Sequence, residues 1–172
     1  MSAGRYRFEL ARSAQEVAAY YHLRKAIFCE EQGLFDGDDG DELDPVSYPI
    51  IAIDSEAEMG QQVVGVVRIY EREPRLWYGG RLGVHPDYRR VGRIGKGLIH
   101  KAVTTAQGWG CDQFLATVQL QNVRFFHRLH WDSIDEIQVL NHPHHLMTAD
   151  LEFYPPGDEI RPTLTMPVLQ VS

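Results

Sequence analysis

The pattern of hydrophobic and polar residues predicts short strands separated by amphipathic helices. Residues 5–10, RYRFEL, alternate polar and apolar side chains, as expected for a half-buried strand. Ser13 and Glu16 then form the sequence pattern of a capping box, and apolar residues recur at helical spacing as far as Gly33. Residues 94–108 repeat this helical spacing, which predicts a second amphipathic helix.

The order of the predicted elements indicates the fold class. Further strands are predicted at residues 48–53, 63–70, 76–84, 113–119, 131–140 and 146–153, and a short helix at residues 123–129. A loop rich in His and Pro, at residues 141–145, separates the last two strands. A run of strands inside flanking helices favours an α+β fold, in which helices cover both faces of a mixed, mostly antiparallel central sheet. We assign residues 1–153 to a single domain, and residues 154–172, with four prolines, to an extended C-terminal segment that docks on it.

The composition adds little to the predicted fold but excludes several classes of protein. With 172 residues, 44% of them hydrophobic and 24% charged, the chain can form one ordinary core, which excludes disordered and coiled-coil proteins. The formal net charge of −7 argues against a nucleic-acid-binding protein, which usually carries a basic surface. Because the two cysteines are far apart and there is neither a signal-peptide pattern nor a stretch of ~18 apolar residues, we expect a cytoplasmic protein outside the membrane.

The charge is unevenly distributed along the chain. Residues 26–67 contain eleven carboxylates and no Lys or Arg, whereas residues 68–101 contain nine basic and three acidic side chains. This division predicts two ligands of opposite charge. The acidic loop at residues 36–44 either is solvated or attracts a cationic amine, since its spacing does not match a calcium-binding EF-hand. The histidines between residues 127 and 145 lack the spacing of a metal site, so no metal is expected.

Residues 82–99, LGVHPDYRRVGRIGKGLI, contain the pattern with the most chemical information. A strand ends at Val84, a Pro-Asp turn follows, and arginines then surround two glycines near the start of a helix at about Ile94. Glycines let the backbone approach phosphate oxygens, N–H groups at a helix N-terminus point at those oxygens, and Arg side chains supply positive charge. The segment is therefore typical of a pyrophosphate-binding site.

This segment resembles the acyl-coenzyme A binding motif of GNAT-type N-acetyltransferases, V-x-P-x-x-R-x-x-G-x-G/A. Residues 119–131, QLQNVRFFHRLHW, resemble the N/Q…FY…LGF segment of the same family. Residues 23–32, LRKAIFCEEQ, and residues 143–147, PHHLM, are similar to the LR…VFVVEQ and PHxxM patterns of its small ElaA-like branch. The chain also resembles a bacterial acetyltransferase group associated with nitrogen-starvation gene clusters, and the likeness to the family spans residues 20–150.

The resemblance implies the GNAT acyl-CoA acyltransferase fold, with acetyl-CoA as co-substrate and no metal. It implies that a primary amine of a small, cationic acceptor attacks the thioester directly in a ternary complex. Backbone N–H groups of residues 82–84 would hold the pantetheine arm and polarise the thioester carbonyl. The residues expected to bind the cofactor are Leu82, Gly83, Val84, Arg89, Arg90, Val91, Gly92, Arg93, Ile94, Gly95, Lys96 and Phe126.

Two departures from the family pattern affect the roles of individual residues. The loop is one residue longer than the motif, which leaves open which Arg and which Gly take the family positions. Phe126 replaces the tyrosine that, in the family, commonly reprotonates the coenzyme A thiolate. A general base is needed because an ammonium group is not nucleophilic, and the candidate catalytic residues are Tyr78, Glu31 and Glu30.

Two other functions stay open at this point. Arg24, Phe28, Glu42 and Asp44 loosely match the early R…F…E-x-D-x-x-D segment of acyl-homoserine lactone synthases, which share the fold. The missing tyrosine at Phe126 agrees with a coenzyme A binding sensor without turnover. In each case the expected partner is a small molecule, and a homodimer could form by exchange of the Pro-rich C-terminal segment.

Overall fold

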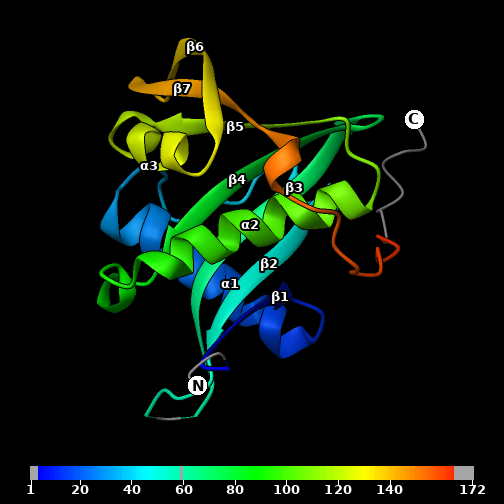
Figure 1. The fold of residues 1–172 in the computed structure, drawn as a ribbon. Helices are drawn as coiled ribbons and strands as arrows, with labels where there is room; N and C mark the ends of the chain where they lie inside the picture. The colour runs from blue at the N-terminus through cyan, green and yellow to red at the C-terminus, as the bar shows by residue number, and fades with distance from the viewer. Residues whose placement is uncertain (1–3, 59, 165–172) are drawn as a thin grey trace, which may run out of the picture.

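The computed structural model describes residues 4–58 and 60–164 as one seven-stranded sheet with three α-helices around it (Figure 1). The strands are β1 (Tyr6–Leu10), β2 (Tyr48–Asp54), β3 (Gln62–Glu73), β4 (Leu76–Val84), β5 (Gln113–Gln119), β6 (Trp131–Val139) and β7 (His142–Ala149), and the helices are α1 (Ala14–Lys25), α2 (Gly92–Gly108) and α3 (Val123–Arg128). The strand order is β1-β2-β3-β4-β5-β7-β6, and the β4–β5 pair is parallel while the other pairs are antiparallel. The predicted α+β fold with a mixed, mostly antiparallel sheet is confirmed.

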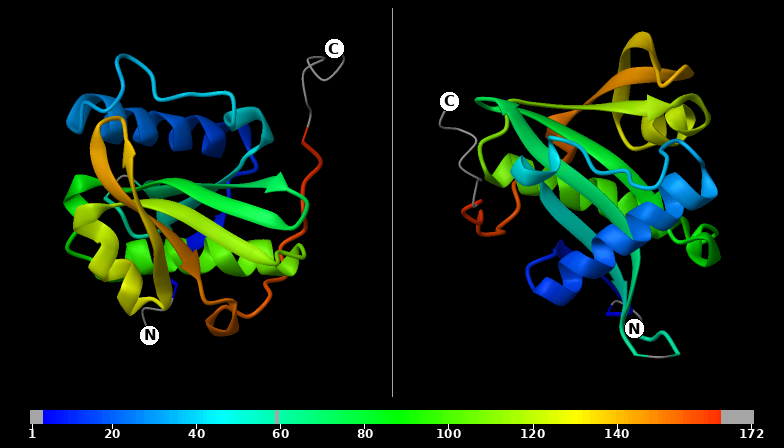
Figure 2. Two further views of the ribbon diagram at one scale, coloured as in Figure 1. Left: turned by 90° about the horizontal axis from the view of Figure 1, so that it is seen from above. Right: turned by 180° about the vertical axis from the view of Figure 1, so that it is seen from behind.

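The helices cover both faces of the sheet. In the view from above, α1 lies on one face and α2 on the other (Figure 2). The smaller helix α3 packs against β6. Within the two described ranges, no helix is long and apolar enough to cross a membrane.

The pairing of β4 with β5 is short, and this determines where the site lies. Residues 76–79 of β4 pair with residues 113–116 of β5, and beyond them the two strands separate. The C-terminal half of β4 therefore has a strand partner on one side only, which is β3. Backbone groups on its other side are left for a ligand.

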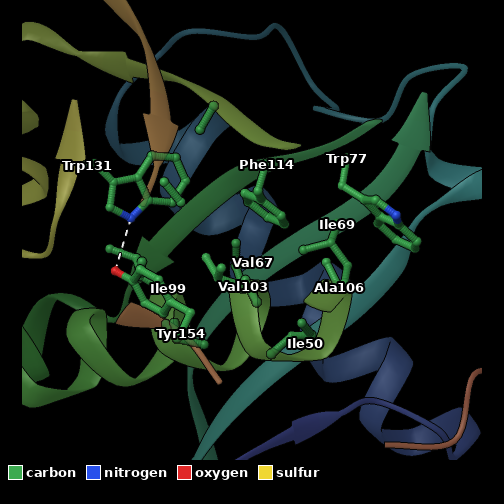
Figure 3. Packing of buried hydrophobic residues seen from close by; sticks show 14 of the residues in the cluster. Ile50, Val67, Ile69, Trp77, Ile99, Val103, Ala106, Phe114, Trp131 and Tyr154 are labelled. Atoms are coloured by element: carbon green, nitrogen blue, oxygen red, sulfur yellow. Dashed lines mark hydrogen bonds between the residues drawn. The ribbon is translucent and has the colours of Figure 1, made fainter. Parts of the chain in front are cut away.

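The larger part of the core lies between the sheet and α2 (Figure 3). Val103 of α2 and Ile69 of β3 are completely buried in this cluster, as is Trp77 of β4. Burying a side chain of this size contributes about 1.5–3 kcal/mol relative to leaving it exposed. The indole N–H of Trp131 donates a hydrogen bond of 3.2 Å to the Tyr154 hydroxyl, which ties the start of the C-terminal segment to the core.

The C-terminal segment, described as far as residue 164, lies along α2. The Gly157 N–H donates to the carbonyl oxygen of Thr104 on α2, at 2.8 Å. The guanidinium of Arg161 lies 4.9 Å from the centre of the Trp77 ring and contributes a cation–π contact. Residues 165–172, the rest of the predicted extension, lie outside the described residues.

The periodicity predicted one α-helix as far as Gly33, but the α-helix is shorter than that. α1 ends at Lys25, and residues 26–31 form a π-helical turn in which the N–H of Gln32 donates to the carbonyl oxygen of Ile27. Such turns insert an extra residue and often mark functional sites. Here the turn buries Ile27 and Phe28, and the Ile27 side chain comes so close to Gly83 of β4 that a side chain at Gly83 would crowd it.

The prediction of a His/Pro-rich loop at residues 141–145 is wrong. β7 begins at His142, and the turn consists of Leu140 and Asn141, whose φ angles of 51° and 65° are both positive. Two successive residues with positive φ form the type I′ turn that suits a tight hairpin. The sequence pattern misled because most of β6 is exposed, so these strands show little apolar alternation. The correction places His144 within the sheet.

Candidate active site

A cavity of about 320 Å³ lies where β4 and β5 separate. Residues 78–82 of β4 line one side of it, and residues 116–119 of β5 line the other. Phe126 and Trp131 add aromatic side chains to the lining. An elongated ligand with amide groups, such as a pantetheine arm, suits a cavity between two unpaired strand edges.

An irregularity in β4 exposes further backbone groups at this cavity. Val66 of β3 pairs with Gly83 of β4, and Arg68 pairs with Gly80. Between these two pairs β4 therefore has one residue more than β3, which is a β-bulge. Arg81, inside the bulge, has a positive φ of 52°. The extra residue of a β-bulge stays outside the ladder, so the backbone at the bulge is free to bind a ligand.

The basic loop after β4 leads into the N-terminus of α2. Val91, the residue before the helix, provides no side-chain cap, so the first N–H groups of α2 lack a side-chain acceptor. A Cβ added to Gly92 would meet nothing within 4 Å. Arg90, Arg93 and Lys96 are exposed around this end of the helix. Open backbone donors, the helix dipole and three cations together suit a pyrophosphate.

The glycines of α2 stand at their positions for different structural reasons. A Cβ on Gly95 would make ordinary contact with the Phe125 ring at 3.6 Å. A Cβ on Gly97 would overlap the Phe8 ring. Gly97 is therefore required by the packing of β1 on α2, whereas the surface is open at Gly92, and a Cβ at Gly95 would make only ordinary contact with α3.

Two predicted site residues, Arg89 and Glu31, bind each other. The Arg89 guanidinium donates to both carboxylate oxygens of Glu31, and its Nε also donates to the carbonyl oxygen of Val84 at 3.0 Å. The hydrogen bonds from Arg89 lower the pKa of Glu31, so this carboxylate stays ionised and engaged. Neither Glu31 nor the exposed Glu30 lines the cavity, which separates both from the place where an acceptor amine would react.

Tyr78, the third predicted catalytic residue, does line the cavity. Its ring stacks on Tyr70 of β3, with 5.8 Å between the ring centres and an interplanar angle of 11°. The Arg72 guanidinium lies 5.5 Å from the centre of the Tyr78 ring. Both tyrosines and Arg72 lie on the face of the sheet that α1 covers, since alternate residues of a strand share a face.

Phe126 lies in the cavity wall, in edge-to-face contact with Trp131 at 5.1 Å between ring centres. Tyr154 lies behind Trp131, accepts its indole N–H and donates its own hydroxyl to the Leu129 carbonyl oxygen. Because Tyr154 does not line the cavity, it does not replace the missing family tyrosine. Among the described lining residues, hydroxyl groups come from Tyr70, Tyr78 and Thr117.

His144 is a candidate functional residue that the sequence analysis missed. It is buried on β7, opposite Gln119 of β5, and lines the cavity. Its Nδ1 lies 2.9 Å from the carbonyl oxygen of His142. Since a carbonyl oxygen only accepts, this contact places a proton on Nδ1, and in the neutral ring Nε2 then has the free lone pair. The signal was present in the sequence, because His144 is the histidine of the PHxxM-like segment.

Three of the six carboxylates in the acidic loop form ion pairs with arginines, whereas Asp36, Asp38 and Glu42 are exposed. Asp44 accepts from Arg24 at 2.7 Å and from Arg68 at 2.9 Å. Asp41 accepts from both terminal nitrogens of Arg68, at 2.7 and 2.8 Å. Asp39 accepts from Arg24 at 2.8 Å and from Arg81 at 3.1 Å. We call these three aspartates and three arginines the aspartate–arginine clamp.

Burial gives the clamp its stability and its charge state. Arg24 has no exposed surface, and Asp39 is 1% exposed. The hydrogen bonds from Arg68 lower the pKa of Asp41, and those from Arg24 lower the pKa of Asp44 although burial opposes this shift. The clamp therefore holds three negative and three positive charges. The prediction of a cationic acceptor loses part of its support, because the protein's own arginines neutralise three of the six carboxylates in this loop.

The described residues contain no group of three His, Cys, Asp or Glu side chains positioned to hold a metal ion. Cys29 is half-buried and Cys111 is buried, and both are free thiols. Burial raises the pKa of both thiols, that of Cys111 to about 11. Neither lines the cavity, so the chemistry of the site rests on its backbone, arginine, tyrosine and histidine groups.

Comparison with protein families gives one match. The model of the acetyltransferase (GNAT) family matches residues 13–131. This range includes the cavity walls from β3 to α3, the basic loop and the aspartate–arginine clamp. No curated protein sequence matches the chain.

Solved structures share the fold over most of the chain. A candidate N-acetyltransferase from Lactobacillus plantarum is 20% identical with a TM-score of 0.75, and the match covers 86% of this chain and 99% of that one. ElaA from Escherichia coli is 20% identical with a TM-score of 0.67, covering 84% and 98%. The CoA-dependent acyl-homoserine lactone synthase BjaI, solved with SAM and isopentyl-CoA, is 20% identical with a TM-score of 0.65, covering 80% and 77%. At these identities the likeness concerns the fold.

Proposed function

Since the chain belongs to the acetyltransferase (GNAT) family, we propose that it moves an acetyl group from acetyl-CoA to a primary amine of a small acceptor. The observation that carries this proposal is that β4 joins two features: its bulge lines the cavity, and its end leads into the uncapped N-terminus of α2. One ligand with a pyrophosphate at one end and a thioester at the other would occupy both.

The donor would be held by groups along β4 and α2. The first N–H groups of α2, with Arg90, Arg93 and Lys96, would bind the pyrophosphate. The free edge of β4 at Leu82 would bind the pantetheine amides, and a backbone N–H at the bulge would polarise the thioester carbonyl. Phe126, in the wall of the cavity, is available to pack against the arm.

The reaction would proceed by direct transfer. The amine nitrogen forms a bond to the thioester carbon, the carbon–sulfur bond breaks, and coenzyme A leaves as a thiolate. The nitrogen loses a second proton as it becomes an amide nitrogen, and water carries that proton to the thiolate. The proton that the acceptor ammonium must lose before attack passes to Nε2 of His144. Tyr78 is the second candidate for this base, because it lines the same cavity.

Replacing His144 by Gln tests this role. Gln keeps a polar side chain but cannot take up a proton, so kcat should fall at least about tenfold. The matched variant Tyr78→Phe should have a smaller effect, and the Kd for acetyl-CoA should stay within about twofold in both. A larger loss in Tyr78→Phe would assign the base to the tyrosine.

Calorimetry and thiol release test the function itself. Acetyl-CoA should bind with a Kd in the range of about 1 μM to 1 mM that is usual for enzyme substrates, and a panel of primary amines should include some that release the coenzyme A thiol at a saturable rate. Failure to bind acetyl-CoA would contradict the proposal. Binding without release for any amine would favour a coenzyme A sensor instead.

An acyl-homoserine lactone synthase is a second candidate function, and two findings favour it. BjaI shares the fold, and Arg24 and Asp44, two of the residues that match the synthase segment, form a partly buried ion pair. Phe28, a third, lines the cavity, whereas Glu42 is exposed. Incubation with S-adenosylmethionine and a series of acyl-CoA donors, followed by mass spectrometry, would detect a lactone, and its absence with every donor would discard this function.

A further inference from the structure

The charge of the cavity differs from what the sequence suggested. Its described lining contains Arg68, Arg72 and Arg81 and no Asp or Glu. The carboxylates that bind Arg68 and Arg81 belong to the aspartate–arginine clamp, and none of them lines the cavity. An acceptor that enters this cavity therefore meets guanidinium groups and no carboxylate.

The clamp neutralises two of the three arginines but not the third. Arg68 and Arg81 bind Asp39, Asp41 and Asp44 as described above. Within residues 4–58 and 60–164, Arg72 forms no ion pair; it is exposed, and its guanidinium contacts the Tyr78 ring. The cavity therefore carries about one unbalanced positive charge on the wall formed by β3.

Arg68 adds a hydrogen-bond donor to this wall. The residue is 3% exposed, and its Nε–H has no partner among the described residues. Nε lies 3.7 Å from the place that a side chain on Gly80 would occupy, at the bulge of β4. A buried N–H without an acceptor costs about 1–3 kcal/mol, and an oxygen of a bound ligand at the bulge is an acceptor that would remove this cost after a small adjustment.

We propose that the acceptor amine also carries a carboxylate, as an α-amino acid or a compound with an amino-acid end does, and that Arg72 binds this carboxylate. The inference rests on the proposed function and names the acceptor class for the same site. A guanidinium matches a carboxylate in a bidentate geometry, and His144 lines the same cavity from β7, across the split between β4 and β5.

The remaining lining indicates what else the acceptor carries. Phe28, Leu34 and Phe35 line the cavity beside the arginines, and the Arg81 guanidinium lies 4.5 Å from the centre of the Phe35 ring. These side chains suit an apolar group rather than a second cation. A polyamine would bring two or more positive charges next to Arg72, which disfavours binding because like charges repel.

The test compares each amino acid with the amine that lacks only its carboxylate. The pairs are L-phenylalanine and phenethylamine, L-methionine and 3-(methylthio)propylamine, and L-ornithine and putrescine. Thiol release from acetyl-CoA gives kcat/KM for each compound, and calorimetry gives its binding to the protein loaded with coenzyme A. In at least one pair the amino acid should be preferred by about 10- to 100-fold, as expected for a charged hydrogen bond.

Two variants of Arg72 and one control variant show whether Arg72 causes the preference for the amino acid. Arg72→Gln should reduce the preference to about twofold or less by raising KM for the amino acid, with KM for acetyl-CoA unchanged. Arg72→Lys should retain part of the preference, because the charge remains without the planar fork. Arg7→Gln removes a partly exposed arginine on β1, away from the cavity, and should behave as the wild-type protein.

The outcomes separate this inference from the proposed function. If the decarboxylated amines react as well as the amino acids or better, or if Arg72→Gln keeps the preference, the acceptor class is wrong while the acetyltransferase function stands. If acetyl-CoA binds but no amino acid binds or reacts, the acceptor class is also wrong. If acetyl-CoA does not bind, the proposed function fails first and the inference fails with it.

Discussion

Replacing Asp44 by Asn tests whether the acidic loop is a structural clamp. Asp44 accepts two hydrogen bonds from Arg24, at 2.7 and 3.3 Å, one from Arg68 at 2.9 Å and one from the Asp41 N–H at 3.1 Å. Asn is nearly the same size but neutral, and its NH₂ group cannot accept. The substitution leaves three arginines, of which Arg24 has no exposed surface, facing two aspartates.

The expected cost follows from the burial of the partners. Removing one partner of a buried ion pair typically costs about 3–5 kcal/mol, because a charge stays buried without compensation. That is a large share of the ~5–15 kcal/mol by which domains are stable. With an m-value of about 2 kcal/mol per M, the urea midpoint should fall by about 2 M.

Urea unfolding followed by circular dichroism measures this cost, with Asp36→Asn as the matched control. Asp36 lies in the same loop, is exposed and takes part in no side-chain hydrogen bond among the described residues, so its substitution should change stability by less than about 0.5 kcal/mol. If Asp44→Asn is no more destabilising than Asp36→Asn, the clamp does not hold the loop, and the attraction of a cation by these carboxylates would have to be reconsidered.

Three further predictions concern other parts of the molecule. The hydrogen bond from Arg5 lowers the pKa of Asp54 to about 2, below the ~3.9 of an unfolded chain. The stability this gives is complete above pH ~4 and is lost as the pH falls toward 2, so urea midpoints should drop over that window, and Asp54→Asn should flatten the drop. Gly97→Ala should cost about 1–3 kcal/mol, because the added Cβ overlaps an aromatic ring of β1; an unchanged Tm would contradict this packing. Replacing Arg90 and Arg93 together by Ala should raise the Kd for acetyl-CoA and weaken its dependence on salt. Tm should fall by no more than about 2–4 °C, because both are exposed and the contact of Arg93 with the Tyr6 ring contributes about 0.5–1 kcal/mol. Calorimetry at two ionic strengths measures both effects on binding, and an unchanged Kd would show that this loop does not bind the phosphates.

The fold and the place of the basic loop before α2 could be predicted from the sequence because the signals are local. β4 and β5 have the bounds that their β-branched and apolar runs predict, at residues 76–84 and 113–119. The basic loop is contiguous in sequence, so its arginines and glycines needed only the strand before it and the helix after it to be placed. Local spacing is sufficient for such elements.

The charge of the acceptor side could not be predicted, because it depends on contacts between distant residues. Arg68 meets Asp41 across 27 positions of sequence, and Arg24 meets Asp44 across 20. The spacing of residues along the chain does not reveal such pairs, so the sequence alone predicts that the carboxylates of the loop are unpaired. His144 was missed for a similar reason: its place in the cavity depends on the hairpin turn at residues 140–141, which has no strong Gly signal.

The most direct measurement is a crystal structure of the protein with acetyl-CoA bound. We expect the pyrophosphate at the N–H groups that begin α2, the pantetheine arm along the free edge of β4, and the thioester in the cavity between β4 and β5 with Nε2 of His144 on the acceptor side. Acetyl-CoA bound elsewhere, with the cavity between β4 and β5 left to solvent, would contradict the proposed function.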